Sequence, residues 1–422
     1  MLRRTFALLL ASLGLAACTT LGISGQDPSR PVIGAPVPIS PQATAKLYPA
    51  SGGSRVAILV PLTGARAEIG QALVQAARVA LETQGAPALD QQDTAGTPEG
   101  AATAARAAIA AGAGIILGPL SSAETAAVAP IARAAGVPVL AFTNDASQAQ
   151  PGVWPLGISP THQVQRLAVA LQAQGKTRLA GLLPDNEFGR AMAAGLTQTA
   201  STLGLGEPRI RTYTGAGIGG LNGAAREISD YGSRRGRIEA ESRAARAPGT
   251  AEARRRSAEI SRRGVPPATF DALLLADTGE ALESLASLLP YYDISPPTIR
   301  LLGPSLWAAG NSGAARFIGA WYAAPDPTNR AAFEQAFTAK TGEPPPGIAD
   351  IAFDAAAIAR IAASSGFSGV ALTRADGFLG ADGLLGLLPD GRTRRGLAIF
   401  EIQRGGPQMV EPAPQTLAAP GS

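Results

Sequence analysis

Apolar residues along this chain fall into short continuous runs, and between the runs lie Ala-rich segments with helical spacing. The clearest case spans residues 115–142. Here the run Ile115-Ile116-Leu117 is followed by an Ala-rich segment over Glu124–Ala135 and by a second apolar run, Val137–Phe142. Unbroken apolar runs of this length are typical of strands in a parallel sheet that is covered on both faces. The pattern therefore predicts a β–α–β unit.

The same alternation occupies most of the chain. Upstream, it predicts a strand at 56–60 and helices at 69–83 and 99–112. It starts again at 162, where the predicted elements are helices at 163–174 and 190–203 and strands at 178–183, 209–213, 272–275, 298–302 and 319–323. A chain of 422 residues is too long for a single hydrophobic core. We therefore predict an α/β fold with two doubly wound lobes.

The domain boundaries follow from the places where the pattern restarts. We assign residues 55–160 and 326–378 to lobe 1 and residues 161–325 to lobe 2, with a hinge near Pro325. Residues 379–408 are predicted to return through the hinge and to close lobe 2 with a hairpin, because Asp390-Gly391 lies between two apolar runs. Residues 409–422 are expected to form a flexible tail.

The N-terminal residues 1–17 have the features of a lipoprotein signal peptide. Arg3-Arg4 precede a short apolar segment, and Leu15-Ala16-Ala17-Cys18 resembles a bacterial lipobox. In such a sequence Cys18 is lipidated and becomes the mature N-terminus, and two or more acyl chains hold a protein stably on a membrane. The alternative is an ordinary secretory signal with an incidental Cys. Thr19 in place of Asp favours the outer over the inner membrane, by analogy with other lipoproteins.

Residues 18–54 are rich in Pro, and their apolar positions show no period. Pro-rich chain is extended and semi-rigid. We expect this segment to be a tether that holds the folded lobes away from the membrane. The alternative, for part of it, is an ordered arm packed on a lobe.

An Arg-rich insertion interrupts the predicted second lobe. Residues 223–266 contain eleven Arg, no Lys and six acidic residues, a net charge of +5 against +4 for the whole chain. Structureless loops of this length are uncommon in compact domains. The mixed charges and the many Ala residues favour one or two solvated helices. The alternative is a binding site for an anionic partner, such as a membrane surface, a polysaccharide or a protein; nucleic acid is not expected for an exported chain.

Polar residues gather where the predicted strands of the first lobe end. In open parallel sheets the ligand crevice lies at the carboxyl ends of the strands. Hydroxyls, an amide and a helix N-terminus together suit a small polar or anionic ligand. The first-lobe candidates are Thr63, Ser121, Ser122, Thr143, Asn144, Asp145 and Ser147.

The residue inventory argues against an enzyme. With one His and one Cys, the chain has no intrachain disulfide, and most metal-site and catalytic-triad chemistry is excluded. Nucleophile elbows, phosphate-binding loops and metal-ligand spacings are absent from the sequence. His162 lies at a predicted helix start, where capping or hinge packing is favoured over catalysis. We expect no cofactor and no metal, and a hydrolase in the cleft is the least favoured function.

Several ordered segments carry a family resemblance over roughly residues 55–404. They are Val56-Ala57-Ile58-Leu59-Val60-Pro61-Leu62-Thr63-Gly64, Leu117-Gly118-Pro119-Leu120-Ser121-Ser122, Asp185-Asn186-Glu187-Phe188-Gly189, Leu302-Gly303-Pro304-Ser305 and the tail from Phe378 to Ile402. Together they resemble the type I periplasmic binding proteins of the leucine/isoleucine/valine-binding kind. The resemblance implies two α/β lobes, a hinge of three crossing strands and an interlobe ligand cleft.

The resemblance also implies how a free amino acid would bind, and this chain departs from that pattern. Ser122 and the loop 143–147 match the first-lobe residues that hold the ligand. On the second lobe, Phe188 stands where the family has a Tyr hydroxyl, and Ser305 stands where it has an acidic residue. Asp277, at another strand end, is the candidate substitute for that charge. Leaving the ligand's buried ammonium unpaired would cost several kcal/mol, enough to lose micromolar affinity.

The lipobox, the tether and the altered pocket together resemble the penicillin-binding-protein activator lipoproteins. This resemblance implies a periplasmic, non-enzymatic protein whose partner is a peptidoglycan synthase. The alternative is the substrate-binding protein of an ABC importer, with a permease as partner and a branched-chain amino acid or a related small polar solute as ligand.

Overall fold

The computed structural model describes residues 52–215, 217–309 and 312–416. Within them, the first sheet has the strand order β2-β1-β3-β4-β5, and every neighbouring pair is parallel. Its strands are β1 (Arg55–Val60), β2 (Leu89–Asp93), β3 (Ala113–Leu117), β4 (Val139–Ala141) and β5 (Val153–Pro155). The predicted signal peptide, Cys18 and the tether up to residue 51 lie outside the described residues.

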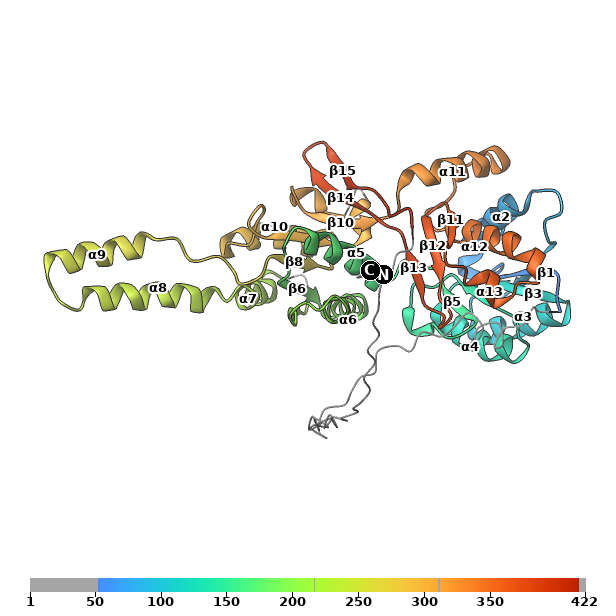
Figure 1. Cartoon of the computed structure of the whole chain (residues 1–422), viewed down its shortest axis with the longest axis horizontal. Helices are drawn as coiled ribbons and strands as arrows, with labels where there is room; N and C mark the ends of the chain where they lie inside the picture. The colour runs from blue at the N-terminus through green and yellow to red at the C-terminus, as the bar shows by residue number, and fades with distance from the viewer. Residues whose placement is uncertain (1–51, 216, 310–311, 417–422) are drawn as a thin grey trace, which may run out of the picture. The chain divides into compact units, whose positions relative to one another are not determined.

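Helices cover both faces of this sheet because its central strands are apolar on both sides (Figure 1). In β1, Val56, Ile58 and Val60 pack toward α2 (Ala67–Leu81) and α12 (Ala349–Ala362). The alternating residues Ala57 and Leu59 pack toward α3 (Pro98–Ala110) and α4 (Ser122–Ala134). This sheet and its helices are lobe 1, to which α11 (Pro327–Thr341) and α13 (Gly369–Leu372) also belong.

The second sheet repeats the same order. Among the described residues it runs β15-β14-β10-β9-β8-β6-β7, so that β7-β6-β8-β9-β10 are arranged as β2-β1-β3-β4-β5 are in lobe 1. Only β14 and β15 are antiparallel to their neighbours. The strands are β6 (Leu179–Pro184), β7 (Arg209–Tyr213), β8 (Ala272–Leu275), β9 (Arg300–Gly303), β10 (Trp321–Ala324), β14 (Ala398–Gln403) and β15 (Gly406–Glu411). With α5 (Pro160–Ala173), α6 (Glu187–Thr202), α7 (Ile218–Ile228) and α10 (Gly279–Leu288), this sheet forms lobe 2.

The described chain passes between the two sheets three times: after β5, after β10 and after β13 (Thr393–Arg395). Each sheet is doubly wound with parallel strands, and the predicted fold class is therefore confirmed. The polar strand β2 and the short strand β5 were not predicted.

The closing segment differs from the prediction. The Asp390-Gly391 turn joins β12 (Gly383–Leu387) to β13, and both belong with β11 (Phe378–Gly380) to a separate antiparallel sheet. Phe378, Leu385 and Leu387 are buried in the lobe 1 core, so the predicted placement of this hairpin on lobe 2 is wrong.

The hairpin that closes lobe 2 is instead β14–β15, and it continues to Glu411. The prediction of a flexible tail from residue 409 is therefore wrong, because residues 409–411 pair with β14 and Ala413 is buried.

The Arg-rich insertion is helical, as the mixed-charge pattern predicts. After α7, helices α8 (Tyr231–Arg246) and α9 (Ala251–Arg262) lie side by side as a helical hairpin (Figure 1). Few of their side chains are buried, and Arg234 at the start of α8 is the largest of these. The insertion is thus a two-helix extension of lobe 2 whose outer faces are solvated.

Candidate functional site

The first group of candidate residues lies where β3 and β4 end in lobe 1. The chain leaves β3 through Gly118, whose φ of +86° and closeness to Leu59 exclude a side chain: a Cβ would lie 2.3 Å from the Leu59 carbonyl oxygen. This turn brings the start of α4 beside the loop after β4, and the Ser122 Oγ lies 3.0 Å from the Thr143 Oγ1. Two candidates separated by 21 residues are therefore in direct contact.

The loop after β4 is tied together by its own side chains. The Thr143 Oγ1 accepts a hydrogen bond from the Asp145 N–H (3.1 Å), and Asp145 accepts one from the Ser147 N–H (2.9 Å). Burial opposes ionisation of Asp145, but hydrogen bonds from Ser147, Ser122 and Gln148 outweigh it and lower the pKa of this carboxyl group. Asp145 is thus a carboxylate whose oxygens already accept hydrogen bonds within the loop. Asn144 and Ser147 are exposed.

Thr63 and Ser121 are engaged elsewhere. The Thr63 hydroxyl donates to the Asp93 carboxylate (2.7 Å), which also accepts from the Leu62 and Ala95 N–H groups. Although burial opposes it, these bonds lower the pKa of Asp93. The Ser121 hydroxyl takes part in the capping box of α4, where it donates to the Glu124 carboxylate (2.6 Å).

The second lobe contains a hollow of about 370 Å³ where β6, β7 and β8 end. This is the point at which the strand order of the sheet reverses, and open α/β sheets bind ligands at such points. Its lining comes from lobe 2 alone and consists of Pro184, Asp185, Asn186, Tyr213, Thr214, Gly215, Asp277, Thr278, Glu280 and Ala281. The first-lobe candidates are not among these residues.

Asp277 is the candidate that this hollow contains. Its carboxylate accepts hydrogen bonds from the Tyr213 hydroxyl (2.8 Å) and the Thr278 N–H (2.9 Å). Burial and the Asp277 charge raise the pKa of Tyr213, which therefore stays a neutral donor. With Asp185 and Glu280 in the same lining, the hollow presents acceptor oxygens and suits a ligand that carries ammonium or hydroxyl donors.

Phe188 and Ser305 do not line this hollow. Phe188, in the first turn of α6, packs against the apolar cluster that α5 and α6 form with the sheet. The Ser305 N–H donates to the Gln163 side chain of α5 (2.7 Å). The structure therefore brings Ser122, Thr143, Asp145 and Ser147 together and places Asp277 in a hollow, while Thr63, Phe188 and Ser305 contact other groups.

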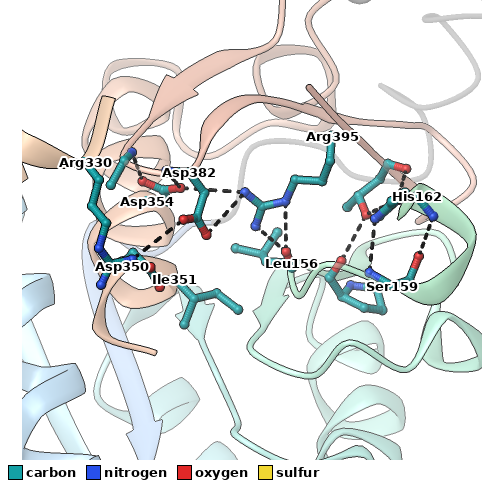
Figure 2. Close-up of polar contacts among 12 residues, drawn as sticks. Leu156, Ser159, His162, Arg330, Asp350, Ile351, Asp354, Asp382 and Arg395 are labelled. Carbon is teal, nitrogen blue, oxygen red and sulfur yellow. Dashed lines mark hydrogen bonds and ion pairs between the residues drawn. The ribbon is translucent and has the colours of Figure 1, made fainter. Parts of the chain in front are cut away.

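A charged cluster and a histidine lie where the chain crosses between the lobes (Figure 2). Arg395 of β13 donates to the Leu156 carbonyl oxygen from Nε (3.1 Å) and also from Nη2, so that it binds the first crossing to the third. Its Nη1 lies 3.7 Å from an Asp354 oxygen and 3.9 Å from an Asp382 oxygen. Burial and the neighbouring Asp382 raise the pKa of Asp354 to about 7.

His162 makes the second link between these crossings. Its Nδ1 accepts from the Ser159 N–H (3.2 Å), and its Nε2 lies 2.9 Å from the Thr393 carbonyl oxygen. A neutral ring with the proton on Nε2 satisfies both contacts. Burial, with the nearby Arg395 charge, lowers the pKa of His162 to about 4. The predicted capping and hinge role agrees with this geometry.

The described residues offer neither a metal-ligand cluster nor a membrane-spanning helix. Residues 52–215, 217–309 and 312–416 contain no group of three His, Cys, Asp or Glu side chains placed to hold a metal ion. In the same ranges, every helix is too short or too polar to cross a membrane.

The family model described as "Periplasmic binding protein" matches residues 54–233, which span the whole first sheet and continue past β7 into α8. The chain has the type I periplasmic binding protein fold. The resemblance inferred from the sequence is confirmed. No curated protein sequence matches the chain.

Solved structures with this periplasmic binding protein fold include two kinds of protein. A structure from Rhodospirillum rubrum assigned to a branched-chain amino acid ABC transporter is 18% identical, with a TM-score of 0.64; the match covers 84% of this chain and 99% of that one. The C-domain of LpoA from Haemophilus influenzae, described as a regulator of PBP1A, is 16% identical, with a TM-score of 0.58 and coverage of 84% and 99%. Full-length LpoA is 16% identical, with a TM-score of 0.62, and the match covers 88% of this chain but 61% of that one. At these identities the likeness establishes the fold.

Sequence reasoning missed several residues of these sites. Tyr213 was predicted only as a strand end, and Asp93 lies on a strand that was not predicted. Arg395 lies within the tail from Phe378 to Ile402 that carries the resemblance, but it was not a predicted site residue, although it connects two crossings. Asp354 was not among the predicted site residues, yet it is 2% exposed and belongs to the Arg395 cluster.

Proposed function

We propose that this chain is a non-enzymatic, membrane-anchored periplasmic lipoprotein that activates a penicillin-binding protein, a synthase of peptidoglycan. The observation that carries the proposal concerns the amino-acid site that the resemblance implies, whose lobe 2 positions Phe188 and Ser305 lack the expected hydroxyl and acidic groups. Phe188 replaces the expected hydroxyl and packs into the α5–α6 cluster, and Ser305 brings no charge. A protein that works by contact with a synthase does not need that site.

Two further features support an activator. The lipobox at Cys18 and the Pro-rich segment 18–54 suit a protein that has to reach its partner from a membrane, and the lipobox with Thr19 favours the outer one. The structural match to the C-domain of LpoA, described as a regulator of PBP1A, covers 99% of that domain.

The test is a reconstituted synthesis assay. We expect the purified full chain to bind one of the bifunctional peptidoglycan synthases of its own cell, and to raise the rate of glycan polymerisation or of peptide crosslinking. The matched control carries Tyr213→Phe and Asp277→Asn in the lobe 2 hollow, and it should activate as well as the wild type. The absence of both binding and rate change with every such synthase would contradict the proposal.

The lobe 2 hollow favours a second candidate, the substrate-binding protein of an importer. Its acceptor oxygens suit the ammonium group of an amino acid or a related small polar solute. A genuine ligand at a hundredfold excess over its Kd adds ~2.7 kcal/mol to the free energy of unfolding, which a thermal-shift screen detects. A shift that disappears in the Tyr213→Phe/Asp277→Asn variant would favour this candidate over the activator.

A further inference from the structure

The helical hairpin of α8 and α9 carries most of its net positive charge at one end. We define its tip as residues 243–256, whose charged residues are Arg243, Arg246, Glu252, Arg254, Arg255 and Arg256, all of them exposed. Toward the base, Arg235 pairs with Glu239 and Arg263 pairs with Glu241. Within the described residues, no tip Arg forms an ion pair. The tip therefore has a net charge of +4 over 14 residues.

The base of the hairpin is held firmly to lobe 2. Arg234 is fully buried and donates to the carbonyl oxygens of Ser229 (2.8 Å), Tyr292 (2.9 Å) and Pro266. Four bonds to fixed groups, counting Asp293 at 3.3 Å, leave the start of α8 little freedom. The charged tip is thus attached to the lobe through an ordered stem.

The two helices are also joined along their length. The Ser242 hydroxyl lies 2.9 Å from that of Ser257 and 2.7 Å from that of Ser261. At the turn, Gly249 has φ +72°, and the Thr250 hydroxyl caps α9 by accepting from the Ala253 N–H (3.0 Å). The tip Arg side chains therefore extend from two helices that keep a defined spacing.

The composition of the tip discriminates between classes of partner. It contains no aromatic and no large apolar side chain, only Ala, Pro, Gly and Thr besides the charges. Protein interfaces depend on buried aromatic and apolar anchors, which this end of the hairpin lacks. An anionic phospholipid surface requires no such anchor, since clusters of basic residues bind it electrostatically. Arg suits this role because its planar guanidinium forms paired hydrogen bonds with phosphate.

We propose that the tip of the α8–α9 hairpin is a docking site for an anionic phospholipid bilayer. The contact goes beyond the activator function and does not depend on it. It gives lobe 2 a second attachment to the membrane, besides any lipid at the N-terminus. Because the contact is electrostatic, it weakens as salt rises.

The test is co-flotation of the full chain with vesicles of pure phosphatidylcholine or of phosphatidylcholine with about a third phosphatidylglycerol. The tip variant carries Arg254→Gln, Arg255→Gln and Arg256→Gln. The matched control carries Arg78→Gln, Arg106→Gln and Arg360→Gln, three exposed Arg residues on lobe 1 helices. Both variants lose three positive charges, and all three proteins share the same N-terminal residues.

We expect the wild type and the control to partition more strongly into the phosphatidylglycerol vesicles. The tip variant should lose about ten- to hundredfold of that partition coefficient, and salt should remove the same preference from the wild type. Equal losses in both variants would overturn the proposal, because net charge alone would then explain the binding. Equal partitioning of the wild type into the two kinds of vesicle would also overturn the proposal. Binding of the wild type to purified peptidoglycan, lost in the tip variant while vesicle binding is unchanged, would instead assign the tip to the cell wall.

Discussion

At the scale of single residues, the crossing region contains two ionisable groups, Asp354 and His162, whose pKa values are shifted by burial. In both cases the shift favours the neutral form of the side chain. Asp354 is buried beside Asp382, and its pKa is raised to about 7. His162 is enclosed between Ser159 and Thr393, and its pKa is lowered to about 4. Both groups favour their neutral forms, because burial disfavours charge. Their effects on stability should oppose each other.

The sign for each group follows from proton linkage. Between pH ~4 and ~7 the folded state holds a proton on Asp354 that the unfolded state has released, so this group makes stability fall as pH rises. Between pH ~4 and ~6.5 the unfolded state protonates His162 and the folded state does not, so this group makes stability rise. We expect His162→Gln to make the slope of unfolding free energy against pH more negative than in the wild type, by up to ~1.4 kcal/mol per pH unit. Asp354→Asn should make it more positive by a similar amount.

Urea denaturation of the three proteins at several pH values measures these slopes. Parallel stability curves for all three would show that neither group changes its proton affinity on folding.

Some contacts between site residues could be predicted from the sequence, and others could not. Ser122, Thr143 and Asp145 were predicted as a group because each follows a strand end, and parallel strands end at one edge. Tyr213 contacts Asp277 across 64 residues because β7 and β8 flank β6 in the sheet. Such a contact depends on strand order, about which an apolar pattern carries no information.

At the scale of elements, the apolar runs and Ala-rich segments located most of the buried strands and helices, although not the short buried strand β5. They failed for β2, whose sequence Leu-Asp-Gln-Gln-Asp lies at the edge of its sheet and has no apolar run. They also failed for β15, a partly exposed edge strand that contains Pro407. Edge strands need little burial, and so the signal that identifies central strands is missing there.

One element depends strongly on a single side chain. Arg234 holds the start of α8 through three carbonyl oxygens, and its removal leaves those acceptors buried and unpaired. We expect Arg234→Ala to lower the free energy of unfolding by about 3 kcal/mol. Trypsin should then cleave the α8–α9 hairpin faster.

The neighbouring Arg235→Ala is the matched control, because Arg235 is exposed and pairs only across the helix surface. It should leave both the melting temperature and the cleavage rate near the wild-type values. Similar behaviour of the two variants would mean that the buried bonds of Arg234 do not hold the hairpin.

At the scale of the whole molecule, the two lobes have separate hydrophobic cores. Among the described residues, one set of buried side chains surrounds the first sheet and another surrounds the second, and no residue belongs to both. The links between lobes include the three crossings and the polar contacts of Arg395 and His162. A defect in one core should therefore weaken mainly that lobe.

Leu117→Ala in lobe 1 and Leu274→Ala in lobe 2 form a matched pair, since both side chains are buried in central strands. Each should cost about 2–5 kcal/mol. Native-state hydrogen exchange should show faster exchange in β1, β3 and β4 for the first variant and in β6, β8 and β9 for the second. Uniform acceleration over both sheets would indicate that the molecule opens as one cooperative unit.

The three crossings also govern when folding can finish during synthesis. Lobe 1 draws its first sheet from residues before 156, but one face of that sheet is covered by α12 and by buried residues as late as Leu387. Lobe 2 in turn gains β14 and β15 only after residue 397. A nascent chain therefore exposes an uncovered apolar sheet until α12 and Leu387 have been made, and such surfaces aggregate or attract chaperones. Neither lobe has all of its buried residues before Leu387, so a chain released ahead of that residue leaves both lobes unfinished.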